Sequence, residues 1–125
     1  MSDSLEKKIF LICPVRGINE EEAQFLHDYL IKLENKGYKV HYPPRDTNQE
    51  DPIGLNICSE NRAAIRNADE IHIYYTSKSE GSKFDFRMVF MAEKPLKLIN
   101  RDKVERTPHK SFQNVLLELD AKYKL

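Results

Sequence analysis

Short apolar segments alternate with longer segments of helical periodicity along this chain, and this alternation constrains the fold more than any other feature. Residues 8–13 form an apolar run that ends at Pro14, which is typical of a buried parallel strand. Similar runs predict strands at residues 38–42, 70–75 and 95–99. Strands that alternate with helices form parallel sheets covered by helices, so we expect an α/β fold.

The intervening segments predict amphipathic helices. Residues 20–36 begin with three glutamates, end at Gly37 and repeat apolar side chains at helical spacing. Asp51-Pro52 predicts the start of a second helix that runs to about residue 67, with Ile53 on its inward face. Two further helices are predicted, one from Ser82 and one over residues 111–123. Their predicted apolar faces include Met91 in the first and Phe112 in the second.

These elements predict one domain over residues 1–125. We expect a doubly wound, Rossmann-like or flavodoxin-like parallel sheet of four to five strands with helices on both faces and right-handed crossovers. With the strand order 2-1-3-4, a ligand would bind beyond the carboxyl ends of strands one and three. The loops at residues 14–19 and 76–82 lie at that edge.

Composition excludes several classes of protein. The 125 residues carry 20 Lys+Arg and 20 Asp+Glu, and this balance argues against general binding to a nucleic-acid backbone. With 40% hydrophobic and 32% charged residues, the chain fits neither a disordered nor a membrane protein. The polar start at residues 1–8 predicts no secretion signal.

The cysteines and histidines predict no metal site. Cys13 and Cys58 are too few for a disulfide framework or a zinc site, so we interpret them as buried reduced thiols of a cytoplasmic protein. The four histidines show no ligand spacing, and we expect no cofactor. Neither a G-x-x-x-x-G-K-[ST] loop nor a G-x-G-x-x-G motif is present.

Two candidate functional side chains lie on the loops at the predicted edge. Arg16, before Gly17, could bind a phosphate or carboxylate bidentately, or it could pair with a nearby glutamate such as Glu20. Asp85 could act as a nucleophile or base, kept ionised by a helix N-terminus. Alternatively, Ser82-Lys83-Phe84-Asp85 is a capping box.

Two weaker candidates lie elsewhere. Asn61 falls four residues from both Ile57 and Ile65, on an otherwise apolar helical stripe, so its amide needs partners in the interior. It either satisfies a loop backbone or faces the ligand crevice. The pair Arg45-Asp46, after strand two, could also reach a ligand.

Taken together, these residues resemble the nucleoside 2-deoxyribosyltransferase family, which includes the 2'-deoxynucleoside 5'-monophosphate N-glycosidases. The likeness covers residues 8–99. It is carried by Arg16-Gly17 after the first strand, by the segment NRAAIRNAD at residues 61–69, and by Ser79-x-Gly81-x-x-Phe84-Asp85-Phe86 followed by Lys94-Pro95.

The resemblance implies cleavage of an N-glycosidic bond through a glycosyl-enzyme ester, which water or a second base resolves. It makes Asp85 the nucleophile. It places two pairs of residues at a substrate phosphate, Arg16 with Gly17 and Ser79 with Gly81. Phe10 would lie near the sugar, and Asn61 would replace an aspartate that orients or protonates the base.

Three positions depart from the family pattern. Asp85 is one methylene shorter than the usual glutamate, Asn61 replaces an acid, and Arg87 replaces a glycine and adds bulk and charge near the pocket. We expect a divergent branch. The resemblance also implies a homodimer or larger assembly, in which Ser111 or Asn114 of a neighbouring subunit completes the pocket.

Three functional hypotheses follow. The first is an N-glycosidase or 2-deoxyribosyltransferase-like enzyme, with Arg16 favouring hydrolysis of a 5'-phosphorylated substrate. The second is a catalytically degenerate nucleotide-binding module. The third is an NAD glycohydrolase-like signalling protein. The sequence specifies neither the base nor the sugar.

Overall fold

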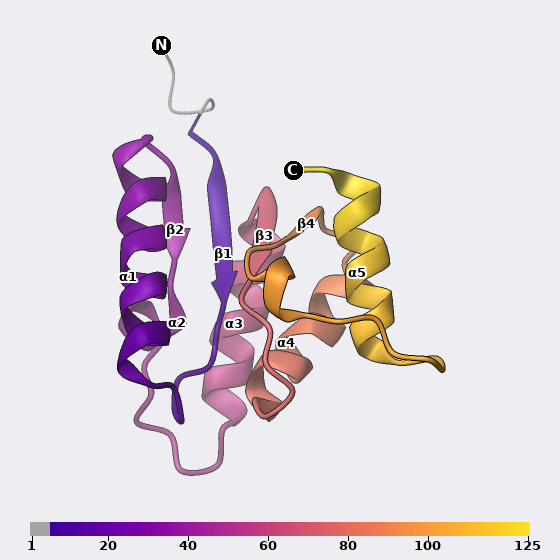
Figure 1. Ribbon diagram of the computed structural model, residues 1–125. Helices are drawn as coiled ribbons and strands as arrows, with labels where there is room; N and C mark the ends of the chain where they lie inside the picture. Colours follow the sequence, from indigo (N-terminus) through magenta and orange to yellow (C-terminus); the bar gives the residue numbers. More distant parts are fainter. Residues whose placement is uncertain (1–5) are drawn as a thin grey trace.

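The computed structural model describes residues 6–125, and its centre is a four-stranded sheet in the order β2-β1-β3-β4 (Figure 1). All neighbouring strands pair in parallel. The strands are β1 (Lys8–Ile12), β2 (Lys39–His41), β3 (Glu70–Ile73) and β4 (Leu96–Leu98). This arrangement confirms the α/β fold and the predicted strand order. The expected polar start falls in part on residues 1–5, which lie outside the described residues.

Helices cover both faces of the sheet because the side chains of β1 alternate between them. Ile9 and Leu11 pack against Leu30 and Leu33 of α1 (Glu20–Asn35). On the opposite face, Phe10 and Ile12 join one core cluster with Ile65 of α3 (Leu55–Asn67) and Phe86 of α4 (Glu80–Met91). A continuous apolar run in β1 therefore builds both halves of the core.

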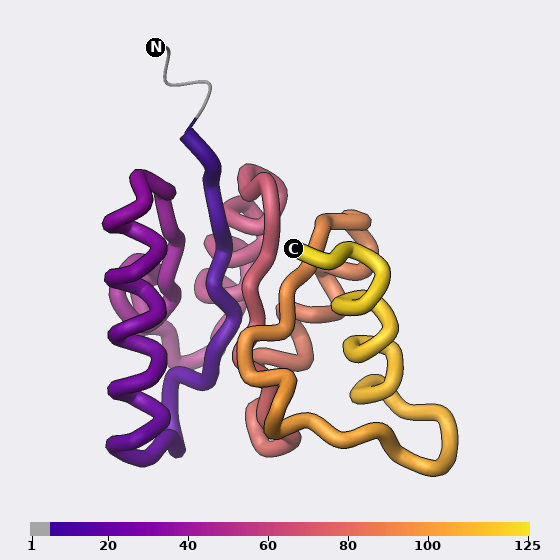
Figure 2. Tube along the Cα trace, turned by 45° about the horizontal axis from the view of Figure 1, so that its top comes forward, coloured from indigo at the N-terminus to yellow at the C-terminus, as the bar shows by residue number. Residues whose placement is uncertain are grey.

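The helix α5 (Phe112–Tyr123) lies along the edge strand β4, as Figures 1 and 2 both show. Leu116 and Leu117 are buried there in the core cluster. The Asp120 carboxylate accepts a hydrogen bond from the backbone N–H of Leu98 at 2.7 Å. A helix thus covers a sheet edge that would otherwise expose unpaired N–H groups.

The helix ends explain where the boundaries differ from the predicted ones. The helix α1 begins as predicted, because Asn19 and Glu22 form a capping box. The helix α3 begins at Leu55 rather than at residue 51 or 52. The Asp51 carboxylate accepts from the N–H groups of Ile53, Asn56 and Ile57, so it caps α3 from outside the helix.

Several finer expectations were wrong. Ile53 and Met91 are 89% and 84% exposed, and Phe112 is 62% exposed, so none of them faces the core. Directly after β2, Pro43–Asp46 forms the helical turn α2. A 3-10 turn, η2 (Arg101–Lys103), interrupts the segment between β4 and α5.

Within residues 6–125, no helix is long and apolar enough to cross a membrane.

Candidate functional site

A cavity of about 400 Å³ lies beyond the carboxyl ends of β1 and β3, where the strand order reverses. Its volume is in the range of small-molecule sites. The cavity is lined by residues from the segments after β1, β2 and β3 and from the N-terminal halves of α3 and α4. Its lining includes five of the predicted site residues: Arg16, Asn61, Ser79, Gly81 and Asp85.

Asp85 lies in the second turn of α4 and is 8% exposed. Burial raises the pKa of its carboxyl to about 7, and the hydrogen bond from Asn61 opposes that rise. We expected the helix N-terminus to keep Asp85 ionised. Asp85 instead lies beyond the first turn of α4, and burial raises its pKa.

The capping-box alternative for Asp85 was also wrong. The helix begins earlier than predicted, with Ser79 as its N-cap. The Ser79 hydroxyl oxygen accepts from the N–H of Ser82 at 3.2 Å. Asp85 is thus free of any capping role, and its carboxylate accepts from the side chain of Asn61.

Asn61 is buried and faces the cavity rather than a loop backbone. Its Nδ2 donates to Oδ2 of Asp85 at 3.3 Å, and its Oδ1 accepts from the hydroxyl of Thr47 at 2.7 Å. Both ends of the amide are therefore engaged, which explains how an asparagine is tolerated on an otherwise apolar stripe.

Arg16 and the N-terminus of α4 bring anion-binding groups to the same cavity. Arg16 is exposed, and within residues 6–125 its guanidinium forms no ion pair, so the alternative pairing with Glu20 does not form. Ser79 donates its hydroxyl proton to Ser82 at 2.9 Å. The first N–H groups of α4, at Glu80 and Gly81, have no intrahelical partners because of their position.

Three predicted residues lie away from this cavity. Phe10 is fully buried in the core and stacks on the His41 ring at 5.2 Å, so the predicted place beside a sugar was wrong for this geometry. Gly17 is exposed with φ of 76° and supports the turn after β1 rather than the lining. Arg45 is bound to Asp46 and Glu34 and faces a different hollow.

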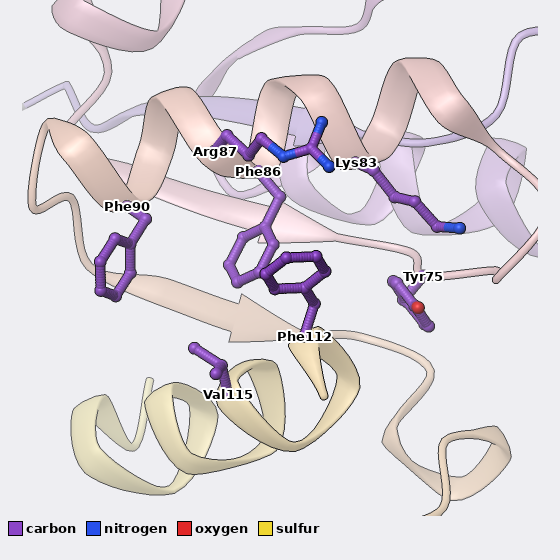
Figure 3. A pocket seen from close by; sticks show the side chains of 7 residues that line it. All are labelled: Tyr75, Lys83, Phe86, Arg87, Phe90, Phe112 and Val115. Atoms are coloured by element: carbon purple, nitrogen blue, oxygen red, sulfur yellow. The ribbon is translucent and has the colours of Figure 1, made fainter. Parts of the chain in front are cut away.

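A second, apolar groove lies between α4 and α5 (Figure 3). Arg87 lines this groove, with its guanidinium 5.6 Å from the centre of the Phe112 ring, and is absent from the lining of the Asp85 cavity. We expected Arg87 to add bulk and charge near the pocket. Its side chain instead lines the groove between α4 and α5.

Ser111 and Asn114 lie at the start of α5, beside that groove. The Ser111 hydroxyl oxygen accepts from the N–H of Asn114 at 3.0 Å. The Asn114 side chain binds backbone groups of Thr107 and His109. Within one chain these residues cap α5, and their contribution to a neighbouring pocket stays a prediction.

Sequence reasoning missed several residues around the cavity. Cys13, Gln49, Cys58 and Lys78 line it, and Thr47 supports Asn61 from behind. Burial raises the pKa of Cys13 to about 12, with Asp85 adding to the rise, so this thiol stays protonated. Cys58 is only half-buried, contrary to expectation. No local sequence pattern marks Thr47, because its burial depends on the helical turn α2 that precedes it.

The fold is similar to those of two solved enzymes. One is a 2-deoxyribosyltransferase from the psychrotolerant bacterium Bacillus psychrosaccharolyticus, with a TM-score of 0.60 and 18% identity over 87% of this chain and 90% of that one. The other is the CMP N-glycosidase BcmB of Clostridium botulinum, with a TM-score of 0.56 and 19% identity over 92% and 99% of the two chains.

Sequence comparisons find less. No protein-family model matches the chain, and no curated protein matches it. The likeness to the two solved structures covers nearly the whole of each protein, so the chain has the fold of these two nucleoside- and nucleotide-acting enzymes.

Proposed function

We propose that this protein is an N-glycosidase that hydrolyses a nucleoside 5'-monophosphate, and that it is a divergent member of the nucleoside 2-deoxyribosyltransferase family. One observation carries the proposal: the buried Asp85 carboxylate shares a cavity with Arg16 and the N-terminus of α4. The folds of the 2-deoxyribosyltransferase and the CMP N-glycosidase support it.

The phosphate would bind at the Arg16 side of the cavity. A guanidinium can hold a phosphate bidentately, and the free N–H groups at Glu80 and Gly81 favour an anion at the start of α4. Lys78 and Ser79, directly before α4, also line the cavity. A phosphate fixed there directs the sugar towards Asp85.

The reaction then proceeds in two displacements at C1' of the sugar. One oxygen of the Asp85 carboxylate bonds to C1', and the bond from C1' to the base nitrogen breaks, with its electron pair leaving on the base. The base takes a proton from water, because the Asn61 amide donates a hydrogen bond but does not transfer a proton. A second water molecule then attacks C1', and the ester bond breaks, which restores the Asp85 carboxylate. The attacking water gives its proton to the hydroxide left when the base was protonated.

The pKa of Asp85 gives this scheme a defined pH dependence. Only the ionised carboxylate is a nucleophile, and its pKa is about 7. The rate below pH 7 should therefore rise about tenfold per pH unit and level off above about pH 8. If Asp85 acted as a proton donor instead, the rate would fall over the same range.

The test is release of free base from a panel of nucleosides, 2'-deoxynucleosides, their 5'-monophosphates and NAD, measured by chromatography. We expect release from a monophosphate, and loss of that release in Asp85→Ala. Arg16→Ala should lower the rate on the monophosphate by about 30- to 100-fold, corresponding to roughly 2–3 kcal/mol, and leave nucleosides unaffected. Arg62→Ala, an exposed arginine outside this cavity, is the matched control.

Other outcomes separate the alternatives. Tight monophosphate binding without release of base would identify a nucleotide-binding module, in agreement with the shortened carboxylate at position 85 and the amide at position 61. Release of nicotinamide from NAD would identify an NAD glycohydrolase. Either result would overturn the proposed reaction.

The assembly is part of the same proposal. The exposed apolar side chains Phe90, Phe112 and Val115 gather on α4 and α5, where a second copy would cover them. We expect a homodimer by light scattering, and Phe112→Ser should shift it towards the monomer.

A further inference from the structure

A chain of hydrogen bonds runs from the Asp85 carboxylate away from the cavity, towards the end of β2. Asn61 Nδ2 lies 3.3 Å from Asp85 Oδ2, Asn61 Oδ1 lies 2.7 Å from Thr47 Oγ1, and Thr47 Oγ1 lies 2.8 Å from His41 Nε2. The two outer members, Thr47 and His41, do not line the cavity. His41 is the last residue of β2, and Thr47 directly follows α2.

One set of directions satisfies every bond in this chain. Thr47 has one hydroxyl proton and gives it to Asn61 Oδ1, so the hydroxyl oxygen must accept from His41 Nε2–H. Burial lowers the pKa of His41, and the neutral ring carrying its proton on Nε2 satisfies this arrangement. The Asn61 amide is then oriented with its oxygen towards Thr47 and its N–H towards Asp85.

The geometry around the chain makes this orientation rigid. Thr47 is 3% exposed, and its N–H binds the carbonyl of Pro43 in the helical turn α2. The His41 ring stacks on Phe10 with an interplanar angle of 8°. The fully buried Phe10 therefore supports the outer end of the chain rather than a substrate.

We propose that Thr47 and His41 are positioning residues, which act through Asn61 to hold an N–H group on the Asp85 carboxylate. Without the Thr47 hydroxyl the amide could turn its oxygen to Asp85, which favours the protonated, non-nucleophilic carboxyl. The catalytic value of this device rests on the proposed function. The positioning itself does not, and it can be measured without a substrate.

The experiment follows the titration of Asp85 by carbon NMR of the carboxyl group, in protein labelled at aspartate. Loss of the hydroxyl in Thr47→Val should raise the pKa of Asp85 by about 0.5 to 1 unit, and Thr47→Ser should restore it. His41→Phe keeps the stacking on Phe10 and should give a smaller rise. All variants keep the same ionisable lining groups, which are Cys13, Arg16, Cys58, Lys78 and Glu80. A difference in the pKa of Asp85 between variants therefore comes from the hydrogen-bond chain.

The matched control is Thr107→Val, because Thr107 is a half-buried, hydrogen-bonded threonine near α5 and distant from the chain. It should leave the pKa of Asp85 unchanged. If Thr47→Val destabilises the protein but leaves that pKa unchanged, Thr47 is only structural and the proposal is overturned. If Thr47→Val does not fold, an Asp85 pKa in His41→Phe identical to that of the unmodified protein overturns it as well.

The measurement separates the two proposals. A protein that releases no base from any substrate would disprove the proposed reaction, while a raised pKa in Thr47→Val would still establish the positioning. Conversely, active protein with an unmoved pKa would leave the reaction in place and remove the positioning role.

Discussion

Two buried carboxylates lie on opposite faces of the sheet, and burial has opposite outcomes for them. Asp85 of α4 is 8% exposed, and burial raises its pKa to about 7. Glu70 of β3 is 9% exposed, yet its pKa is lowered. Burial alone would raise the pKa of Glu70 too, so the difference comes from the partners of the two groups.

Glu70 has a cationic partner, and Asp85 has none among the described residues. Lys7 forms an ion pair with Glu70 at 3.2 Å, and His72 Nε2 donates to it at 2.8 Å. On the far side of the His72 ring, Nδ1 accepts from the hydroxyl of Tyr29 in α1 at 2.5 Å. This network, Lys7–Glu70–His72–Tyr29, ties α1 to β3 and gives each of its buried groups a partner.

Asp85 has a neutral amide in place of the Lys7 cation. Within residues 6–125, its side chain accepts one hydrogen bond and forms no ion pair. A neutral donor recovers less of the cost of burying a charge than a cation does. The face with α1 is therefore built for stability, while the cavity face holds a carboxylate at the expense of stability, which is typical of a functional site.

The largest expected effect is a gain in stability from Asp85→Asn. The pKa of Asp85 is raised from 3.8 to about 7, so the folded state binds more protons than the unfolded state between about pH 4 and pH 7. Stability contributed by the protonated group is present below pH 4 and is lost as the pH rises through 7. The amide introduced by the substitution avoids this loss, and the variant should gain about 4 kcal/mol at pH 8 from a shift of roughly three units.

Urea denaturation at pH 8 and at pH 4 measures this gain, which should nearly vanish at the lower pH. The same variant should be inactive, since an amide is no nucleophile. A gain of equal size at both pH values would mean that ionisation of Asp85 is not its source.

Replacing the Glu70 carboxylate by an amide should lower the stability of the folded protein, which is the opposite of the effect at Asp85. The lowered pKa of Glu70 means that its charge stabilises the folded protein above pH 4.5, and that this contribution is lost as the pH falls through the folded-state pKa. Glu70→Gln should cost roughly 2 kcal/mol at pH 7, because hydrogen bonds to a charged group are replaced by neutral ones. The loss should shrink in acid, and a gain at pH 7 would contradict the comparison.

The sequence predicted the frame of the molecule better than the state of its charged groups. Strand order and the edge that holds the cavity follow from the alternation of apolar runs, and Arg16, Asn61, Ser79 and Asp85 met there as expected. The predicted ionisation of Asp85 failed because it depended on where α4 begins. Ser79, not Ser82, caps the helix, which moves Asp85 into the second turn.

Long-range contacts account for the other failures. Phe10 looks like any strand residue, and only the pairing of β1 with β2 shows that its ring meets His41. Thr47 lies in a polar segment, and its burial depends on a helical turn that two prolines start. Neither contact leaves a local pattern in the sequence.

The smallest expected effect comes from Tyr29→Phe, which removes one hydroxyl from the stabilising network. The hydroxyl donates to His72 Nδ1, and a neutral hydrogen bond of this kind contributes about 1 kcal/mol. Tyr123→Phe is the control, since within the described residues the Tyr123 hydroxyl forms no hydrogen bond. Burial lowers the pKa of His72, so the ring is neutral at pH 8 and the loss should be constant from pH 7 to pH 9. Because this network lies on the other face of the sheet, base release should be unchanged in Tyr29→Phe, and a parallel loss of activity would show that the two faces are coupled.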